Sequence, residues 1–380
     1  MSMALENIRV LDLTHYQAGP TCTMLLADMG AEVIKVEPPW GDQGRFLPPL
    51  DKGGLSPYFA HLNRNKKSIA LNLKHTKGVE ILKELVKVSD VVVENFAPGT
   101  MERLGIGYKT LKEINPRIIF ASISGFGQYG PYSGRLSFDW IAQAMSGFMA
   151  IEGDAASPGG PPITLVESLG DTIPGMFGTI GVLTALYHRN LTGRGQRIDV
   201  AQLDSLISVI LSITYYTMSG MAWHQVARKY RDFGPSGMYR ARDGHVYIVA
   251  PPGAILDRLM KVLPVEDVDQ DAVGRWVQDR TVDEVVSTLV EAKVPVAPVL
   301  TIDKVITDPH VRAREMVVEV EHPKAGTVRT PGFPIKFSKT PGKIRKVAPL
   351  LGQHTEEVLS RLLGYSRDKI DRLREEKVVI

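Results

Sequence analysis

Apolar and polar positions alternate along the first 125 residues with two different periods. Short runs rich in valine and isoleucine, bounded by glycine, proline or asparagine, predict β-strands at residues 8–14, 31–38, 68–74, 90–96 and 117–124. Between them, segments such as CTMLLADMG and KGVEILKELVKVS carry apolar residues at helical spacing. Strands that alternate with helices over short connections predict a parallel α/β sheet covered on both faces. Because ligands of such sheets bind at the carboxyl ends of the strands, the loops that follow the strands are where we expect a site.

The pattern changes in the second half of the chain. Residues 172–223 are helical in pattern, with the turn TGRGQ between two apolar stretches. The segment GMYRARDGHVYIVA predicts a β-hairpin that turns at Asp243-Gly244. Thr281 and Glu284 have the spacing of a capping box, which predicts the start of a helix that ends near Lys293.

Prolines and glycines are dense between residues 317 and 350, which predicts an extended crossing segment, and the tail beyond it is again helical in pattern. We therefore predict a discontinuous large α/β domain, residues 1–220 plus 330–380. A smaller α+β domain, residues 225–325, is inserted into it, with linkers between. The length of 380 residues agrees with two or three domains.

Composition narrows the possible functions. The chain has 45 basic against 42 acidic side chains, and a net charge of +3 is too small for a protein whose main partner is a nucleic acid. The single cysteine, Cys22, excludes an internal disulfide and fits a reducing compartment, so we expect a cytoplasmic protein. The N-terminus lacks a signal-peptide pattern. The apolar run 206–223 is punctuated by serines and threonines and predicts a buried helix rather than a membrane span.

Motifs for metals and common cofactors are missing from the sequence. The nine histidines show neither H-x-x-x-H nor H-E-x-x-H spacing. There is no G-x-S-x-G elbow and no G-x-x-x-x-G-K-[ST] loop. We therefore expect no metal site.

A G-x-G-x-x-G motif occupies residues 125–130 and is typical of dinucleotide-binding folds. Here it follows the fifth predicted strand rather than the first, and Pro131-Tyr132-Ser133-Gly134 comes next, so no helix opens to face a pyrophosphate. A flexible glycine loop over another site explains it better. A nicotinamide-dependent dehydrogenase remains an alternative that the absorbance of bound NAD would test.

Two features near the predicted strand ends could bind an anion. The loop of residues 14–20 leads directly into a helix, whose free N–H groups can hold a negative charge, although an ordinary turn explains it equally well. Basic residues gather near other strand ends and form either a solvated face or a polyphosphate cradle. They are Arg64, Lys66, Lys67, Lys74, Arg103 and Arg135.

Asp171 lies in the segment Ser168-Leu169-Gly170-Asp171-Thr172, just before a helical pattern. The plain interpretation is a helix N-cap, where aspartate is favoured. A carboxylate at a helix N-terminus is also held ionised. An ionised, partly desolvated carboxylate is a usable nucleophile towards an activated acyl group, so Asp171 is a candidate catalytic residue as well.

Taken as an ordered series, these segments resemble family III CoA-transferases, the family of formyl-CoA transferase and carnitine CoA-transferase. The resemblance covers nearly the whole chain and no single motif decides it. It runs through RVLDLTHYQAGP, GAEVIKVE, NKKSIALNLK, DVVVENFAPGTMERLG, GPYSGRLSFDWIAQAMSG, the LGD of Asp171, ALYHRNLTGRGQRIDVAQLDS and APLLGQHTEEVL.

The resemblance implies an interlocked homodimer in which each subunit has a Rossmann-like large domain and a small domain. It implies acyl-CoA and a carboxylic acid as substrates, with no metal, no redox cofactor and no other permanently bound cofactor. Carried over by motif, Asp171 is the nucleophile, Gln17 contacts the acyl group or its anhydride, and Asp139 occupies the acidic position before a helix. The residues expected around CoA are Tyr16, Ala18, Leu71, Lys74, Asn95, Phe96, Ala97, Arg103 and Arg135. Tyr16, Gln17 and Tyr132 are polar, which favours a small polar or dicarboxylic acid.

Two departures from the family concern the edges of this site. Formyl-CoA transferase has a run of consecutive glycines over its active site, and the comparable stretch here is Phe233-Gly234-Pro235-Ser236-Gly237, which implies a stiffer lid. The family's basic residue after the second strand is replaced by proline, because Pro38 and Pro39 follow Glu37. Contacts to the adenine are therefore expected to differ.

Other functions remain open on the sequence alone. An α-methylacyl-CoA racemase has the same fold, but racemases carry histidine directly before the aspartate where this chain has Phe138 before Asp139. Incorporation of deuterium at the α-position of an acyl-CoA would test it. A CoA-binding homologue without catalytic activity is a further alternative, against which Asp171 and Gln17 argue.

Overall fold

The computed structural model describes residues 3–50, 53–222, 224–226, 234–263 and 268–380. The chain forms two compact units. The first comprises residues 1–149, 164–210 and 313–380, and the second comprises residues 150–163 and 211–312. The predicted boundaries at 220 and 330 therefore fall after the observed ones at 210 and 313. In addition, residues 150–163, which were predicted in the large domain, lie in the second unit.

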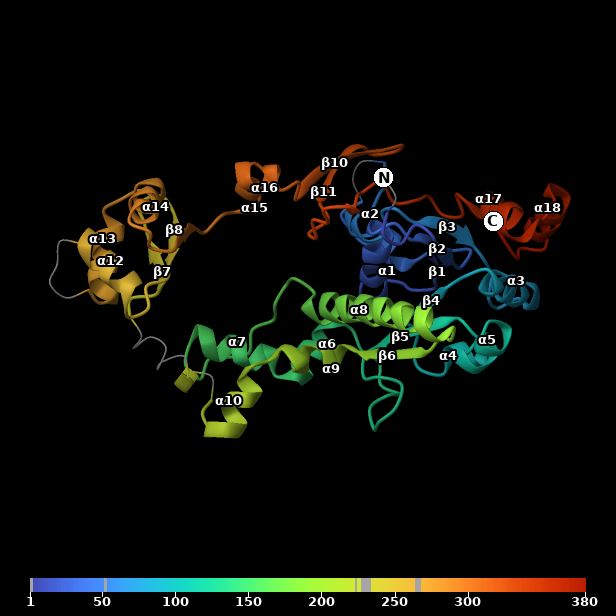
Figure 1. The fold of residues 1–380 in the computed structure, drawn as a ribbon, viewed down its shortest axis with the longest axis horizontal. Coiled ribbons are helices and arrows are strands. Elements are labelled where there is room, and N and C mark those ends of the chain that lie inside the picture. The colour runs from blue at the N-terminus through green and yellow to red at the C-terminus, as the bar shows by residue number, and fades with distance from the viewer. Residues whose placement is uncertain (1–2, 51–52, 223, 227–233, 264–267) are drawn as a thin grey trace. The chain divides into compact units, whose positions relative to one another are not determined.

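The first unit is built on a six-stranded parallel sheet with the strand order β3-β2-β1-β4-β5-β6 (Figure 1). This is the order of doubly wound dinucleotide-type folds. The strands are β1 (Arg9–Asp12), β2 (Glu32–Glu37), β3 (Lys67–Ala70), β4 (Val91–Glu94), β5 (Ile119–Ser124) and β6 (Arg197–Ala201). The first five confirm the predicted strands. The sixth was missed, because RIDVA is a short, half-exposed edge strand that follows a glycine-rich turn.

The sheet is covered on both faces, because successive side chains of each strand point to opposite sides. Val10, Val33 and Val91 face α1 (Ala18–Asp28) and α8 (Leu169–Thr192). Leu11, Ile34, Val92 and Phe120 face the other layer. That layer contains α3 (Thr76–Lys87), α4 (Thr100–Arg103), α5 (Tyr108–Ile114), α17 (Thr355–Leu363) and α18 (Arg367–Glu375). The helical tail is therefore confirmed.

The remaining elements of this unit are connections around the sheet. They are η1 (Gln43–Phe46), α2 (Pro57–Leu62), α6 (Asp139–Ser146), α9 (Gln202–Val209) and the hairpin β10 (Val317–His322) and β11 (Gly326–Pro331); α7 (Phe148–Ala156) crosses the unit boundary. The segment predicted as extended thus begins with an antiparallel hairpin.

The second unit is an α+β structure with its own core. Its antiparallel sheet has the order β7-β8-β9, and Val246, Ile248, Trp276 and Leu289 are buried in its core. Its elements are α10 (Ser212–Ser219), β7 (Gly237–Arg240), β8 (His245–Ile248), α12 (Ala254–Val262), α13 (Gln270–Gln278), α14 (Val282–Glu291), β9 (Val296–Pro298), α15 (Ile302–Val305) and, at the boundary, α16 (Pro309–Ala313).

Two local predictions in this unit are confirmed. The strands β7 and β8 pair in antiparallel fashion around Asp243-Gly244. Thr281 and Glu284 form the capping box of α14, which ends at Glu291, two residues before the predicted Lys293.

The prediction of one buried helix at residues 206–223 is wrong. In the described part of this run, α9 ends at Val209 and α10 begins at Ser212 with no buried residue. The serines and threonines that punctuate the run leave too little apolar surface for a continuous core helix. By length and composition α8 is the one described helix that could cross a membrane, yet it packs against α1 and β5 in the core of the first unit.

Candidate active site

The loop after β1 forms one wall of the candidate site and has an unusual backbone conformation. Tyr16 has a φ of 60°, a left-handed conformation that L-residues other than glycine, asparagine and aspartate rarely adopt. The side chain of Asn95, which follows β4, holds His15, the residue before Tyr16. Its Oδ1 accepts from the His15 N–H at 2.9 Å, and its Nδ2 donates to the His15 carbonyl at 2.8 Å. Such strain persists only where the surroundings fix the backbone, and it is concentrated at functional sites.

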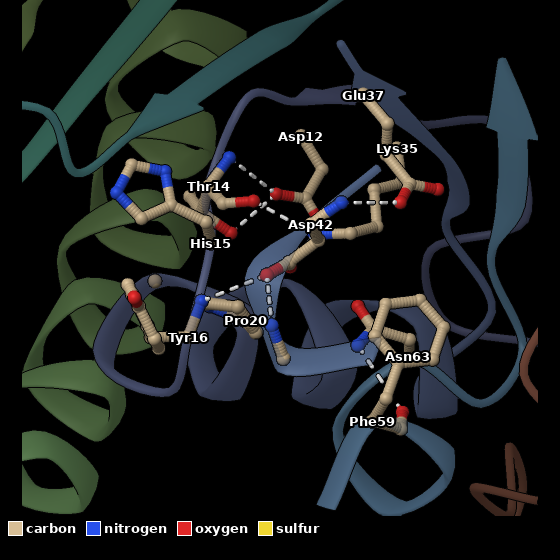
Figure 2. Close-up of polar contacts among 12 residues, drawn as sticks. Asp12, Thr14, His15, Tyr16, Pro20, Lys35, Glu37, Asp42, Phe59 and Asn63 are labelled. Atoms are coloured by element: carbon tan, nitrogen blue, oxygen red, sulfur yellow. Dashed lines mark hydrogen bonds and ion pairs between the residues drawn. The ribbon is translucent and has the colours of Figure 1, made fainter. Parts of the chain in front are cut away.

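A buried network of charges supports this loop (Figure 2). Lys35 Nζ donates to the Thr14 carbonyl at 2.7 Å and pairs with Asp42 Oδ2 at 2.8 Å. Asp12 accepts from the Thr14 N–H at 2.9 Å and from Lys66 Nζ at 2.9 Å. Burial would raise the pKa of Asp12, but Lys66 and Lys35 outweigh it and hold that pKa well below its ordinary value. The loop is thus held by paired charges rather than by apolar packing alone.

The loop after β2 is anchored in the same way. Arg45 forms a bidentate ion pair with Glu37, with both contacts at 2.7 Å, and its guanidinium lies 3.8 Å from the centre of the Phe59 ring. This anchoring presents Trp40, whose ring is 55% exposed and lies 5.3 Å from Lys74 Nζ.

Asp171 lies in the first turn of α8, and Ser168 is the N-cap residue. The interpretation of Asp171 itself as the N-cap is therefore wrong by three positions. The buried Asp139, at the start of α6, accepts from the Gly170 N–H at 2.7 Å and from Gln143 Nε2 at 2.8 Å. A Cβ at Gly170 would lie 2.7 Å from the Asp139 carbonyl oxygen, so only glycine allows this approach of α8 to α6. Asp139 thus holds the turn that carries Asp171.

The Asp171 carboxylate is half-buried, and its surroundings favour the neutral form. Burial and the nearby Asp139 raise the pKa of Asp171 to about 7, although a hydrogen bond from Gln202 acts in the opposite direction. The expectation that the helix N-terminus holds Asp171 ionised is therefore opposed by burial and by Asp139, which both favour the neutral carboxyl group. Gln202 Nε2 lies 2.5 Å from Asp171 Oδ1, and Gln17 Nε2 donates to the neighbouring Thr172 Oγ1 at 3.1 Å.

Two cavities of about 360 Å³ each meet at the carboxyl edge of the sheet. They share His15, Tyr16, Phe96 and Thr100 as lining residues. The first lies among the loops after β1, β2, β3 and β4 and is named the CoA cavity, after the ligand that the family resemblance implies. The second contains Asp171 and is named the acyl cavity for the same reason. Within the described residues, no cluster of His, Cys, Asp and Glu has the arrangement of a metal site.

Comparison with known proteins identifies the family. A family model described as CoA-transferase family III matches residues 5–355. The chain belongs to this family. It transfers CoA between acyl-CoA and carboxylic acids, and CoA esters are its substrates.

The transferase is similar to characterised relatives over nearly its full length. It is 38% identical to the succinyl-CoA:mesaconate CoA-transferase of Haloarcula hispanica, with 94% of this chain and 96% of the relative covered. It is 36% identical to the formyl-CoA:oxalate CoA-transferase of Streptomyces coelicolor, with 99% of both covered. Its fold is similar to the crystal structure of a CAIB/BAIF family protein from Brucella suis, with a TM-score of 0.83, 29% identity, and 95% of this chain and 100% of the other covered.

The structure of the transferase brings most of the predicted site residues together. Those that line the acyl cavity are Tyr16, Gln17, Ala18, Asn95, Phe96, Ala97, Arg135 and Asp171. Leu71 and Lys74 line the CoA cavity with Tyr16 and Phe96. Phe138, in the place of the racemase histidine, also lines the acyl cavity, where its ring meets Tyr16 edge to face at 5.8 Å.

Some predicted residues lie outside the lining of these cavities. Asp139 lies behind Asp171. Arg103 is exposed and donates to Thr100 Oγ1 at 2.7 Å. Tyr132 stacks under the Arg135 guanidinium at 3.8 Å. Arg64, Lys66 and Lys67 pair with Asp28, Asp12 and Glu32, so they do not form a polyphosphate cradle. Phe233, in the expected lid, lies outside the described residues.

Among the residues at the site that sequence reasoning missed are Trp40, Asp42, Ser137 and Gln202. Gln202 directly follows β6, so the strand that was overlooked hid the residue at its carboxyl end. Trp40 was not singled out; only the two prolines before it, Pro38 and Pro39, drew attention to this loop. Asp42 and Ser137 give no signal along the chain, because the Lys35–Asp42 pair matches no periodic motif and Gln202, the partner of Ser137, is distant in sequence.

Proposed function

We propose that Asp171 is the covalent nucleophile of the transferase, and that transfer proceeds through an aspartyl anhydride and an aspartyl-CoA thioester. The observation that carries this proposal is the position of the Asp171 carboxylate. It lines the acyl cavity, which adjoins the CoA cavity across Tyr16 and Phe96. A thioester that spans both cavities would place its carbonyl within reach of Asp171.

The chemistry follows from that arrangement. The carboxylate attacks the thioester carbonyl and expels CoA thiolate, which leaves an acyl–aspartyl anhydride. The thiolate then attacks the aspartyl carbonyl and releases the first acid, and the second acid reverses these steps. Gln17 lines the same cavity, and its amide is a candidate donor to the oxyanions. One such donor contributes on the order of 3 kcal/mol.

The test is to mix the full-length protein with formyl-, acetyl- or succinyl-CoA and to measure its intact mass after an acid quench. We expect a covalent CoA adduct that peptide mapping places at Asp171. The absence of an adduct with every donor that supports turnover would contradict a covalent aspartyl route.

A small dicarboxylic acid is our proposal for the acid. The relatives above are named for the acids mesaconate and oxalate, which are both dicarboxylic, with succinyl-CoA or formyl-CoA as the thioester. In this chain Arg135 lines the acyl cavity, and a guanidinium there suits the second carboxylate of such an acid.

We propose Trp40 as the adenine platform in place of the missing basic residue. Its exposed ring lines the CoA cavity beside Lys74. Because a stacked base contributes about 1–3 kcal/mol, Trp40→Ala is expected to raise KM for acyl-CoA about tenfold. The turnover number at saturation is expected to change little. Steady-state kinetics over a range of acyl-CoA concentrations check this, and an unchanged KM would contradict the assignment.

The pH dependence follows from the raised pKa of Asp171. Only the ionised carboxylate is nucleophilic, and burial together with Asp139 raises its pKa to about 7. We therefore expect kcat/KM to fall as the pH drops below about 7 and to level off above about 8. A pH profile with an intact acyl-CoA donor measures this. Full activity at pH 5 would be inconsistent with this environment.

We further propose an interlocked homodimer in the cytoplasm. Met176, Ile180, Tyr187 and Leu191 recur at helical spacing on α8, and each is 48–69% exposed in the single chain. A second copy of the chain would cover such a stripe. Light scattering on the purified protein tests the dimer.

The free thiol of the buried Cys22 supports a reducing compartment.

A further inference from the structure

Gln202 contacts the candidate nucleophile more closely than any residue predicted from sequence. It is the first residue of α9, directly after the edge strand β6, and its Nε2 lies 2.5 Å from Asp171 Oδ1. Ser137 Oγ donates to Gln202 Oε1 at 2.9 Å. A reversed amide would turn its oxygen towards the carboxylate, so this pair of contacts sets which end of the amide faces Asp171.

We propose that Gln202 is a further catalytic residue, which holds one oxygen of Asp171 and directs the CoA thiolate to the aspartyl carbonyl of the anhydride. This inference rests on the proposed role of Asp171 as nucleophile. The anhydride has two carbonyls that the CoA thiolate can attack, and attack at the acyl carbonyl only regenerates the donor acyl-CoA.

The contact assigns separate roles to the two carboxylate oxygens. With Oδ1 held by the Gln202 amide, Oδ2 attacks the thioester carbonyl and becomes the bridging oxygen of the anhydride. The thiolate sulfur then forms a bond to the aspartyl carbonyl carbon, and the carbonyl electron pair moves onto Oδ1. Collapse breaks the bond from that carbon to the bridging oxygen, which leaves with the first acid as its carboxylate. Because Gln202 Nε2 donates to Oδ1, it stabilises the oxyanion of this attack and not that of the return reaction.

The surrounding backbone holds Ser137 and Gln202 in place. A Cβ at Gly125 would lie 2.1 Å from Ser137 Cβ, and the Gly125 carbonyl accepts from the Leu203 N–H at 3.1 Å. The first glycine of the G-x-G-x-x-G motif therefore allows Ser137 to approach Gln202. The role of the motif here is to position Ser137 and Gln202.

Gln202 also tunes the ionisation of Asp171. The other charged or titratable groups nearby are Asp139 from α6, Tyr58 from α2, His15 and Tyr16 from the loop after β1, and Arg135 from the loop before α6. The Gln202 hydrogen bond lowers the pKa of Asp171, which burial and Asp139 raise. Removal of the amide is therefore expected to raise that pKa further and to move the acidic limb of kcat/KM to higher pH.

The experiment compares the wild type with Gln202→Met, which keeps the length of the side chain but cannot donate. Ser137→Ala leaves the amide in place but removes its orienting partner, and Gln278→Met, at an exposed glutamine of α13, is the control. Each full-length protein is mixed in a single turnover with the donor that gives the wild type its largest adduct, among formyl-, acetyl- and succinyl-CoA. Acid-quenched samples give the rate of aspartyl-CoA formation by intact mass, and kcat/KM is measured from pH 5.5 to 9.

We expect Gln202→Met to slow adduct formation about 100-fold and Ser137→Ala to slow it less, with the acidic limb shifted upward in both. The control should match the wild type. If Gln202→Met forms aspartyl-CoA at the wild-type rate and the acidic limb of its kcat/KM profile stays at the wild-type pH, the role of Gln202 is overturned. Asp171 then remains the nucleophile. A slower rate with an unmoved limb would show a scaffold role and would also overturn the role of Gln202. If Gln202→Met does not fold, Ser137→Ala decides by the same two readouts. The absence of an adduct in the wild type would instead overturn the proposed function, and this inference with it.

Discussion

Asp171→Ala is expected to reduce CoA transfer by about 10⁴-fold or more, because no other carboxylate in the acyl cavity can form the anhydride. The variant is expected to fold and to bind acyl-CoA, since the turn that carries Asp171 is held through the backbone N–H of Gly170. Turnover and intact mass are measured together, and both activity and adduct should disappear. Asp257→Asn, at an exposed aspartate of α12, is the control.

The same variant tests the environment of Asp171 through stability. The folded state binds a proton at Asp171 with a pKa of about 7, above the ordinary value, so the ionised group costs stability at alkaline pH. Asp171→Ala is therefore expected to be more resistant to denaturant than the wild type at pH 8, and this advantage should shrink at pH 5. Substantial residual turnover, or a variant that unfolds at both pH values, would contradict the role assigned to this side chain.

Lys66→Met is expected to lower the free energy of unfolding by about 3–5 kcal/mol, because it leaves Asp12 buried without its main cation. The side chains of Lys66 and Asp12 are both 0% exposed, and Lys66 Nζ also contacts Thr23 Oγ1 and Asn63 Oδ1. Equilibrium denaturation measured by circular dichroism gives the change.

A matched exposed pair provides the control for Lys66. Arg329 and Glu319 are 57% and 58% exposed, so Arg329→Met is expected to change stability by less than about 1 kcal/mol. The double variant Asp12→Leu/Lys66→Met should recover part of the loss, since no unpaired charge remains. Equal effects of Lys66→Met and Arg329→Met would show that the buried pair does not hold the loop after β1.

The fold of the first unit was largely predictable because its signals are local. Five strands and the terminal helices show a clear periodicity. In the second unit the hairpin at Asp243-Gly244 and the capping box at Thr281 were predictable for the same reason, because they depend on residues a few positions apart. The strand β6 was not predictable in this way. It pairs with β5, where Phe120 lies opposite Arg197, and several helices separate these two strands in the sequence.

The candidate site was predictable through family resemblance rather than through the residues themselves. Taken alone, Asp171 was interpreted as an N-cap or a candidate nucleophile, and the basic residues at 64–67 as a solvated face or a phosphate cradle. The N-cap is Ser168, and the three basic side chains pair with carboxylates instead of forming a cradle, because burial and pairing between different elements decide the chemistry. Lys66 needs Asp12 and Lys35 needs Asp42, and neither pair is visible as a pattern along the chain. Gln202 meets Asp171 only because α6, α8 and α9 pack together.

The two cavities draw their residues from different loops, and only a few side chains belong to both. Trp40, Leu71 and Lys74 follow β2 and β3, whereas Arg135, Ser137 and Gln202 follow β5 and β6. On the proposed assignment of the two cavities, substitutions that change which acid is accepted can therefore accumulate in the loops after β5 and β6. Recognition of the coenzyme is meanwhile preserved in the loops after β2 and β3. Such a separation would let a lineage of these enzymes acquire new substrates by small steps, each one still able to use the same cellular pool of thioesters.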